Sequence, residues 1–142
     1  YDGSDITPFL KSKENDQASS IVSGNAMVRQ ELLEYQRHFT KTYNVIAEGR
    51  DTGTEVFPHA DIKIFLTANI EERARRWQHM QACKGLSFTL EQAKKEVTLR
   101  DERDSTREIA PLTIPAGAIV IDNTHLDQQQ TIDAISDIIK NH

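Results

Sequence analysis

Several features that mark particular protein classes are scarce in this chain of 142 residues. It has one cysteine, Cys83, so an internal disulfide framework and a cysteine metal cluster are both excluded. It has no run of about 18 apolar residues that could form a transmembrane helix, and no charged-then-apolar leader for export. We therefore expect a protein of the reducing cytoplasm that has no membrane partner.

Positive charge is also scarce. The chain has 17 Lys and Arg against 22 Asp and Glu, which gives a net charge of -5. Proteins that coat nucleic acid need an excess of basic side chains to neutralise phosphates, so we expect no nucleic-acid partner. A content of 37% hydrophobic and 27% charged residues is ordinary for a globular protein of one domain.

Apolar strand patterns alternate with amphipathic helix patterns along the chain. The expected strands cover residues 44–48, 62–66 and 118–122, and the expected helices cover 24–41, 69–82, 89–109 and 126–140. Asn69 and Thr89 are expected N-caps, and Gln92 completes a capping box with Thr89. This alternation predicts an α/β fold with a parallel sheet flanked by helices.

The last expected helix has an apolar face. It carries four isoleucines at helical spacing, Ile132, Ile135, Ile138 and Ile139. We expect this face to point into the core.

Two charged segments are candidates for a binding site. Arg50 and Asp51 follow the first expected strand, and open α/β sheets bind ligands at the carboxyl ends of their strands. Arg100 and Arg107 lie seven residues apart on an expected helix face, with Arg103 between them. Guanidinium forks bind phosphate oxygens in pairs, and carboxylates accept hydrogen bonds from ribose hydroxyls or base amines. Together the two segments predict a nucleotide pocket.

Each segment has an alternative interpretation when it is taken alone. Gly49-Arg50-Asp51 is also a common loop tripeptide. An arginine-rich helix face is often a solvated ladder of ion pairs. The functional interpretation therefore depends on the segments occurring together.

Five segments occur in the order found in one known family. They are 47–51 (Ala-Glu-Gly-Arg-Asp), 56–58 (Val-Phe-Pro), 64–68 (Ile-Phe-Leu-Thr-Ala), 71–74 (Glu-Glu-Arg-Ala) and 100–112. On these segments nearly the whole chain resembles cytidylate kinase of the bacterial type. The resemblance implies a P-loop nucleoside monophosphate kinase fold. It also implies transfer of the γ-phosphoryl group of ATP to CMP or dCMP, with Mg²⁺ as cofactor.

The resemblance also implies which residues line the CMP site. They are Ser20, Arg29, Arg50, Asp51, Arg100, Asp104 and Arg107. Arg50 would hold the phosphate, and Arg100 and Asp104 would contact the ribose. Asp51, Arg29 and Arg107 would face the cytosine, with Ser20 at the edge of the pocket. Arg50, Arg100 and Arg107 are the expected catalytic residues, because arginines stabilise charge during phosphoryl transfer.

The ATP side is expected on the helix that begins after Asn69. Arg73, Arg75 and Arg76 resemble the start of the mobile lid that closes over ATP in this family, and Arg73 and Arg76 are the expected ATP contacts. The family often has two adjacent arginines where this chain has Arg76-Trp77.

The chemistry of cytosine agrees with the implied contacts. Its exocyclic amine donates a hydrogen bond, which suits the carboxylate of Asp51. Its ring nitrogen and carbonyl accept hydrogen bonds, which suits the guanidinium of Arg29 or Arg107. Uracil reverses two of these groups, so UMP should lose roughly 1 to 3 kcal/mol for each failed contact.

One motif of the family is absent from this sequence. No Gly-x-x-x-x-Gly-Lys-Ser/Thr phosphate loop occurs in it. We therefore expect the carboxyl-terminal two thirds of a cytidylate kinase, a partial domain without the central phosphate-loop strand. Its expected parts are residues 1–42 of the monophosphate-binding region, a core of 43–68 and 110–142, and the lid-like and arginine-rich helices of 69–109.

The expected gap in the sheet has consequences for the chain. The two strands that flank the missing strand should be left with unpaired backbone groups. We expect the complete enzyme to be a monomer, and this chain alone to need the missing segment for efficient phosphorylation of CMP.

Three hypotheses follow from the sequence. The first is a nucleotide kinase represented by an incomplete chain. The second is a noncatalytic module that binds CMP but not ATP. The third is a structural domain on a decayed kinase scaffold, against which the presence of Arg50, Asp51, Arg100, Asp104 and Arg107 argues.

Overall fold

The computed structural model describes residues 3–6, 15, 18, 22 and 25–142. The chain divides into two compact units, Tyr1–Ile46 and Ala47–His142. In the first unit, helix α2 covers Ala26–Phe39, which confirms a helix within 24–41. The Asn25 side chain caps it by accepting hydrogen bonds from the amides of Met27 and Val28, at 3.0 and 3.3 Å.

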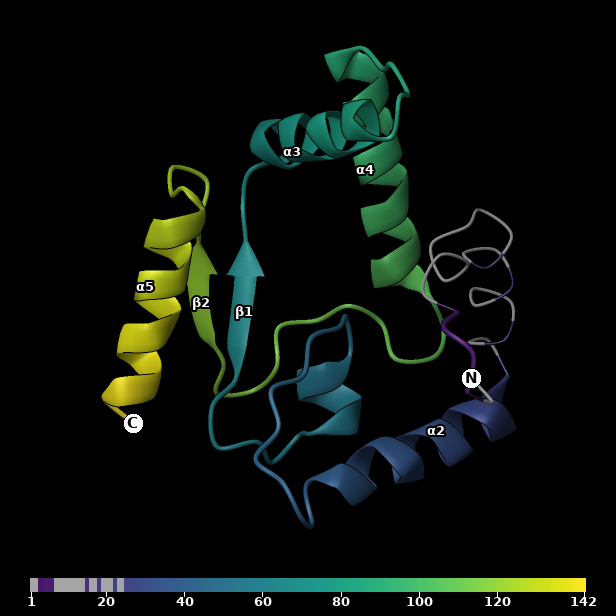
Figure 1. The fold of residues 1–142 in the computed structure, drawn as a ribbon, viewed down its shortest axis with the longest axis vertical. Helices are drawn as coiled ribbons and strands as arrows, with labels where there is room; N and C mark the ends of the chain where they lie inside the picture. The colour runs from purple at the N-terminus through teal and green to yellow at the C-terminus, as the bar shows by residue number, and fades with distance from the viewer. Residues whose placement is uncertain (1–2, 7–14, 16–17, 19–21, 23–24) are drawn as a thin grey trace. The chain divides into compact units, whose positions relative to one another are not determined.

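The second unit contains the sheet. Strands β1 (Ile64–Thr67) and β2 (Ile119–Asp122) pair in parallel, with Ile64 opposite Ile119 (Figure 1). These strands confirm the elements expected near 62–66 and 118–122. Two parallel strands with helices also confirm the α/β class.

The strand expected over residues 44–48 is wrong. The structure assigns no strand there, and the side chain of Ile46 is 96% exposed. A strand is stable only where a neighbouring strand accepts and donates its backbone hydrogen bonds. Among the described residues the sheet has only β1 and β2, so this apolar segment has no strand to pair with.

Three further helices follow in the second unit: α3 (Ile70–Cys83), α4 (Leu90–Thr106) and α5 (Gln128–Lys140). The expected caps are confirmed. Asn69 accepts from the Glu72 amide at 2.8 Å, and Thr89 and Gln92 form a reciprocal capping box. Short side-chain signals therefore determine where α3 and α4 begin.

Helix α4 ends earlier than expected. It stops at Thr106, and Arg107 takes the extended conformation of a C-cap, with ψ of 142°. The Leu112 amide donates to the Asp104 carbonyl at 2.7 Å, which takes an acceptor that a longer helix would use. Arg107 therefore does not continue the helix face of Arg100, as the spacing predicted.

Helices α3 and α4 pack against each other across small side chains (Figure 1). Ala74 of α3 and Ala93 and Val97 of α4 are buried. Trp77 packs edge-on against Phe88, with ring centroids 4.8 Å apart. This helix pair forms one end of the second unit's core.

The isoleucine face of α5 is less buried than expected. Ile132 and Ile139 are 46% and 49% exposed, so the expectation that both face the core is wrong. Two strands about 4.8 Å apart form too narrow a sheet to cover a helix about 10 Å wide. The end of the chain after α5 lies near the start of β1. The imidazole Nε2 of His142 is 2.7 Å from the carbonyl oxygen of Asp61, three residues before β1 begins.

Candidate functional site

The Arg50 and Asp51 segment leads into a single π-helical turn, η2 (Thr52–Val56). The Asp51 carbonyl accepts hydrogen bonds from the amides of Glu55 at 2.8 Å and Val56 at 3.2 Å. The Val56 side chain is buried. These contacts fix the backbone that carries both site residues.

Gly53 lies in η2 where another segment approaches closely. A Cβ at Gly53 would lie 2.7 Å from the Cγ atom of Pro115, well inside contact distance. Only glycine fits here without a shift of one of the two segments. The turn that carries Arg50 and Asp51 is therefore held against the segment that precedes β2.

Two ion pairs connect this turn with the end of α4. Arg50 Nε lies 3.2 Å from Asp104 Oδ2, and Arg107 Nη2 lies 3.7 Å from Asp51 Oδ2. Each pair joins a residue of the turn to a residue more than fifty positions later. The structure thus brings together four of the seven residues expected in the CMP site.

The guanidinium of Arg107 has two protein partners, the Ala110 carbonyl and the Asp51 carboxylate. Its Nε donates to the Ala110 carbonyl, where the backbone takes a positive φ of 51°. Its Nη2 is buried and has no hydrogen-bond partner among the described residues. A separation of 3.7 Å from Asp51 is an ion pair but too long for a hydrogen bond. This nitrogen therefore has hydrogen-bonding capacity that no described residue uses.

The three other expected CMP-site residues are placed differently. Arg100 lies on α4 one turn before Asp104, and its exposed guanidinium has no ion-pair partner in the described part of the chain. Arg29 lies on α2 in the first unit. Ser20 lies outside the described residues.

Both arginines expected on the ATP side contact protein groups. Arg73 donates through Nε to the Ala68 carbonyl at 2.9 Å and pairs through Nη1 with Asp101 of α4. Arg76 pairs with Glu72 at 2.9 Å and donates twice to Asn123. These contacts tie α3 to its surroundings.

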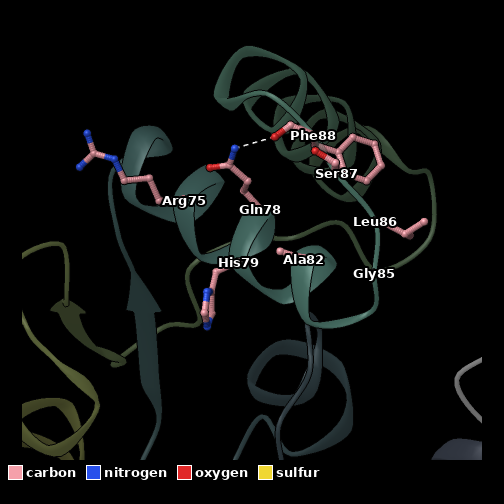
Figure 2. Close-up of a pocket in the computed structure, with 8 residues that line it drawn as sticks. All are labelled: Arg75, Gln78, His79, Ala82, Gly85, Leu86, Ser87 and Phe88. Carbon is pink, nitrogen blue, oxygen red and sulfur yellow. Dashed lines mark hydrogen bonds between the residues drawn. The ribbon is translucent and has the colours of Figure 1, made fainter.

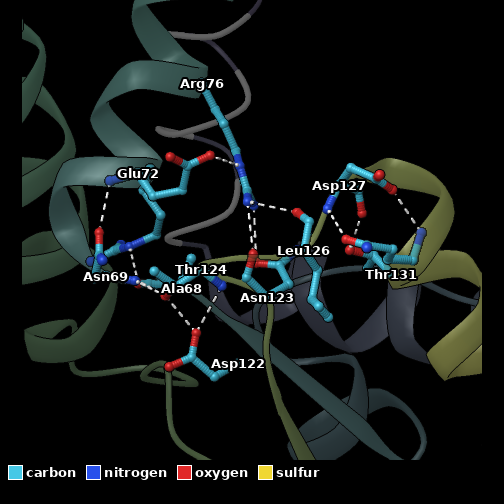
Figure 3. A network of polar contacts seen from close by, with 12 residues as sticks. Ala68, Asn69, Glu72, Arg76, Asp122, Asn123, Thr124, Leu126, Asp127 and Thr131 are labelled. Atoms are coloured by element: carbon cyan, nitrogen blue, oxygen red, sulfur yellow. Dashed lines mark hydrogen bonds and ion pairs between the residues drawn. The ribbon is translucent and has the colours of Figure 1, made fainter.

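A polar network that was not foreseen joins the ends of both strands (Figure 3). Asp122 accepts hydrogen bonds from the amide and hydroxyl of Thr124, and the Thr124 hydroxyl accepts from the Asn69 amide at 2.8 Å. The hydroxyl of Thr124, followed by its amide, holds the pKa of Asp122 below its ordinary value. The sequence signal was Asp122 two residues before Thr124, a pattern typical of side-chain-capped turns.

A shallow, open cavity of about 540 Å³ lies elsewhere, at the turn between α3 and α4 (Figure 2). Its lining comes from Arg75, Gln78, His79, Ala82, Gly85, Leu86, Ser87 and Phe88. Gln78 Nε2 donates to the Phe88 carbonyl at 2.6 Å. None of the expected site residues lines this cavity. We therefore place the candidate site at the ion pairs of Arg50 and Arg107 and not at this cavity.

The described part of the chain contains no group of three or more His, Cys, Asp or Glu side chains that could hold a metal ion. It contains no helix that is both long and apolar enough to cross a membrane.

The comparisons with known proteins agree on one family. The sequence profile of cytidylate kinase matches residues 1–141. A cytidylate kinase of Shouchella clausii (strain KSM-K16) is 42% identical over 142 residues, which is 100% of this chain and 63% of that protein. A cytidylate kinase of Geobacillus sp. (strain WCH70) is 42% identical over 137 residues, 96% of this chain and 61% of that protein.

A third relative has a further activity in its name. A bifunctional pantoate ligase/cytidylate kinase of Synechococcus sp. (strain JA-2-3B'a(2-13)) is 43% identical over 134 residues. The match covers 94% of this chain and 25% of that protein.

Parallel strands and helices define an α/β protein, in which paired arginines and aspartates gather at one site. The chain belongs to the cytidylate kinase family. It spans 61 to 63% of the length of the first two relatives.

Proposed function

We propose that this chain supplies the CMP side of an enzyme that transfers the γ-phosphoryl group of ATP to CMP or dCMP, giving CDP or dCDP. One observation carries the proposal: two ion pairs gather Arg50, Asp51, Asp104 and Arg107 into one site. These are residues to which the family resemblance assigns CMP contacts. Family membership supports the reaction type.

The phosphate and ribose would be bound by Arg50, Asp104 and Arg100. Arg50 presents its guanidinium to the phosphate, and two parallel N–H donors suit two phosphate oxygens. Asp104 and Arg100 bind the ribose hydroxyls, because a carboxylate accepts from a hydroxyl and a guanidinium donates to one. The acceptor phosphate is thereby oriented for phosphoryl transfer, a reaction that depends mainly on position and charge stabilisation.

The cytosine would be recognised by Asp51 and Arg107. Asp51 accepts a hydrogen bond from the exocyclic amine, and the buried Nη2 of Arg107 donates to a ring acceptor. UMP leaves these groups unpaired, which costs roughly 1 to 3 kcal/mol for each contact. Arg29 and Ser20 belong to this proposal on the resemblance alone.

We further propose that the chain by itself does not transfer phosphate efficiently. Its sequence contains no phosphate loop for the ATP phosphates. The described residues also contain no group of three or more His, Cys, Asp or Glu side chains that could hold a metal ion. The complete enzyme is proposed to be a cytoplasmic monomer that uses ATP and Mg²⁺.

A second candidate function is a noncatalytic module that binds CMP without ATP. The contacts of the two lid-side arginines favour it. Arg73 is engaged by Ala68 and Asp101, and Arg76 by Glu72 and Asn123. The ATP contacts expected for both arginines would require them to leave these partners.

Calorimetric titration with CMP, dCMP and UMP tests the proposal. We expect CMP to bind more tightly than UMP, and we expect Arg107→Ala to abolish this binding. Lys95→Ala is the matched control, because Lys95 is an exposed cation on α4 outside the site. Equal affinity for CMP and UMP, or a loss of binding in the control, would contradict the proposed site.

A kinase assay tests whether the chain alone transfers phosphate, and a titration with ATP tests the noncatalytic module. We expect no CDP from this chain with ATP, Mg²⁺ and CMP, although CMP binds. Turnover at the rate of a complete cytidylate kinase would show that the chain holds its own ATP site. Titration with ATP should then show binding, which the noncatalytic module excludes.

A further inference from the structure

The arginines and aspartates of the candidate site pair with each other. Arg50 is the proposed phosphate ligand, and its Nε lies 3.2 Å from the carboxylate of Asp104. Asp104 is the proposed ribose ligand. A residue expected on the sugar therefore lies against a donor that could also hold a phosphate oxygen.

We propose that Asp104 competes with a bound anion for the guanidinium of Arg50, and that an anion reaches the Nε donor of Arg50 only by displacing Asp104. This inference rests on the proposed CMP site. It adds a selection step, because the displaced carboxylate needs a new partner. Inorganic phosphate offers Asp104 only its own P–OH groups, whereas a nucleotide also brings sugar hydroxyls that donate to Asp104.

The side chains of Arg50 and Asp104 differ in exposure, so losing the ion pair costs Asp104 more than Arg50. The side chain of Arg50 is 42% exposed, so an anion in solvent can reach it. The side chain of Asp104 is only 17% exposed, so water compensates its lost partner poorly. Displacement therefore disfavours an anion that leaves Asp104 unpaired.

The backbone keeps Asp104 in place during the exchange. Its carbonyl accepts from the Leu112 amide at 2.7 Å, and this bond does not involve the carboxylate. Only the side chain has to turn from Arg50 toward the sugar. The site thus discriminates against free phosphate by an unpaired charge rather than by its shape.

Phosphate titration of the 15N-labelled chain tests this exchange through the amide NMR signals of Gly49 and Asp51. Asp104→Asn removes the competing charge and keeps the side-chain volume. We expect it to bind inorganic phosphate about two- to fivefold more tightly than the original chain, the range given by a partly exposed ion pair. The same variant should bind CMP less tightly, because its amide replaces a charged acceptor.

Two controls identify the origin of the gain. Glu102→Gln removes the same charge from the same helix, two residues away, and should leave phosphate affinity unchanged. Arg50→Met combined with Asp104→Asn should abolish the gain. Asp104→Ser gives a second test of the same charge if the asparagine variant does not fold.

The outcomes separate this inference from the proposed function. Equal phosphate affinity in Asp104→Asn and the original chain, or an equal gain in Glu102→Gln, overturns the exchange whatever CMP does. Failure of the folded original chain to bind CMP overturns the proposed function, while the phosphate titration still measures competition at Arg50.

Discussion

Arg76 of α3 donates two hydrogen bonds to Asn123, one to its side-chain Oδ1 at 2.9 Å and one to its backbone carbonyl at 2.8 Å (Figure 3). Asn123 is buried at the end of β2. One guanidinium therefore satisfies two polar atoms of a buried residue 47 positions later. The contact fixes the loop before α5 against α3.

Arg76→Met should lower the free energy of unfolding by about 1 to 3 kcal/mol, because it leaves buried acceptors of Asn123 without their donor. Urea unfolding monitored by Trp77 fluorescence measures the change. Arg75→Met is the matched control, since Arg75 is an exposed neighbour that pairs with Glu71 and should cost at most about 0.5 kcal/mol. Equal losses in both variants would show that the Asn123 contact adds no stability.

Gly53→Ala should destabilise the second unit by about 1 to 3 kcal/mol, because the new methyl group would overlap Pro115. The same urea measurement applies. Pro115→Ala removes the Cγ atom that is approached most closely, so the double variant should lose less than the sum of the two single losses. If the stability losses of the two single variants add up in the double variant, the strain of Gly53→Ala does not come from contact with Pro115.

Asp122 should show a pH dependence set by Thr124. Because hydrogen bonds lower its pKa in the folded chain, the stabilisation is present above the unfolded pKa and is lost as pH falls through the folded pKa. Thr124→Val removes the hydroxyl, the largest cause, and keeps the backbone donor. Carboxyl NMR titration should show the pKa of Asp122 rising toward its ordinary value.

The control for this titration is Thr98→Val, on an exposed position of α4. It should leave the pKa of Asp122 unchanged. An unchanged pKa in Thr124→Val would mean that the hydroxyl does not stabilise the carboxylate.

The parts of the fold that could be predicted depend on local signals. Asn69 and Thr89 act on amides three residues away, so short patterns were enough to find the starts of α3 and α4. The end of α4 depends instead on a bond between Leu112 and Asp104. The spacing of apolar residues in a helix does not show such a bond. The sequence pattern therefore predicted a helix to residue 109, although α4 ends at Thr106.

Strand formation shows the same limit more clearly. The apolar run at residues 44–48 has strand propensity, but propensity supplies no partner for its backbone. β1 and β2 have each other, and both were found. A single chain segment cannot show whether its neighbour in the sheet exists.

The candidate site was predictable in its residue types and not in its pairing. The resemblance named Arg50, Asp51, Asp104 and Arg107, and the structure gathers them. Which carboxylate lies on which guanidinium depends on the path of the chain from 104 to 112. The roles of these four residues toward CMP stay predictions, as do those of Ser20, Arg29 and Arg100. The roles of Arg73 and Arg76 toward ATP also stay predictions.

Because β1 pairs with a strand on one edge only among the described residues, its amides should alternate between slow and fast hydrogen exchange. Successive amides of a strand point in opposite directions, so alternate N–H groups of β1 face β2 while those between them face away. The first set should exchange slowly with deuterated water and the second set quickly. A strand inside a wider sheet protects every residue, so this alternation along four consecutive residues is a direct record of how many neighbours the strand has.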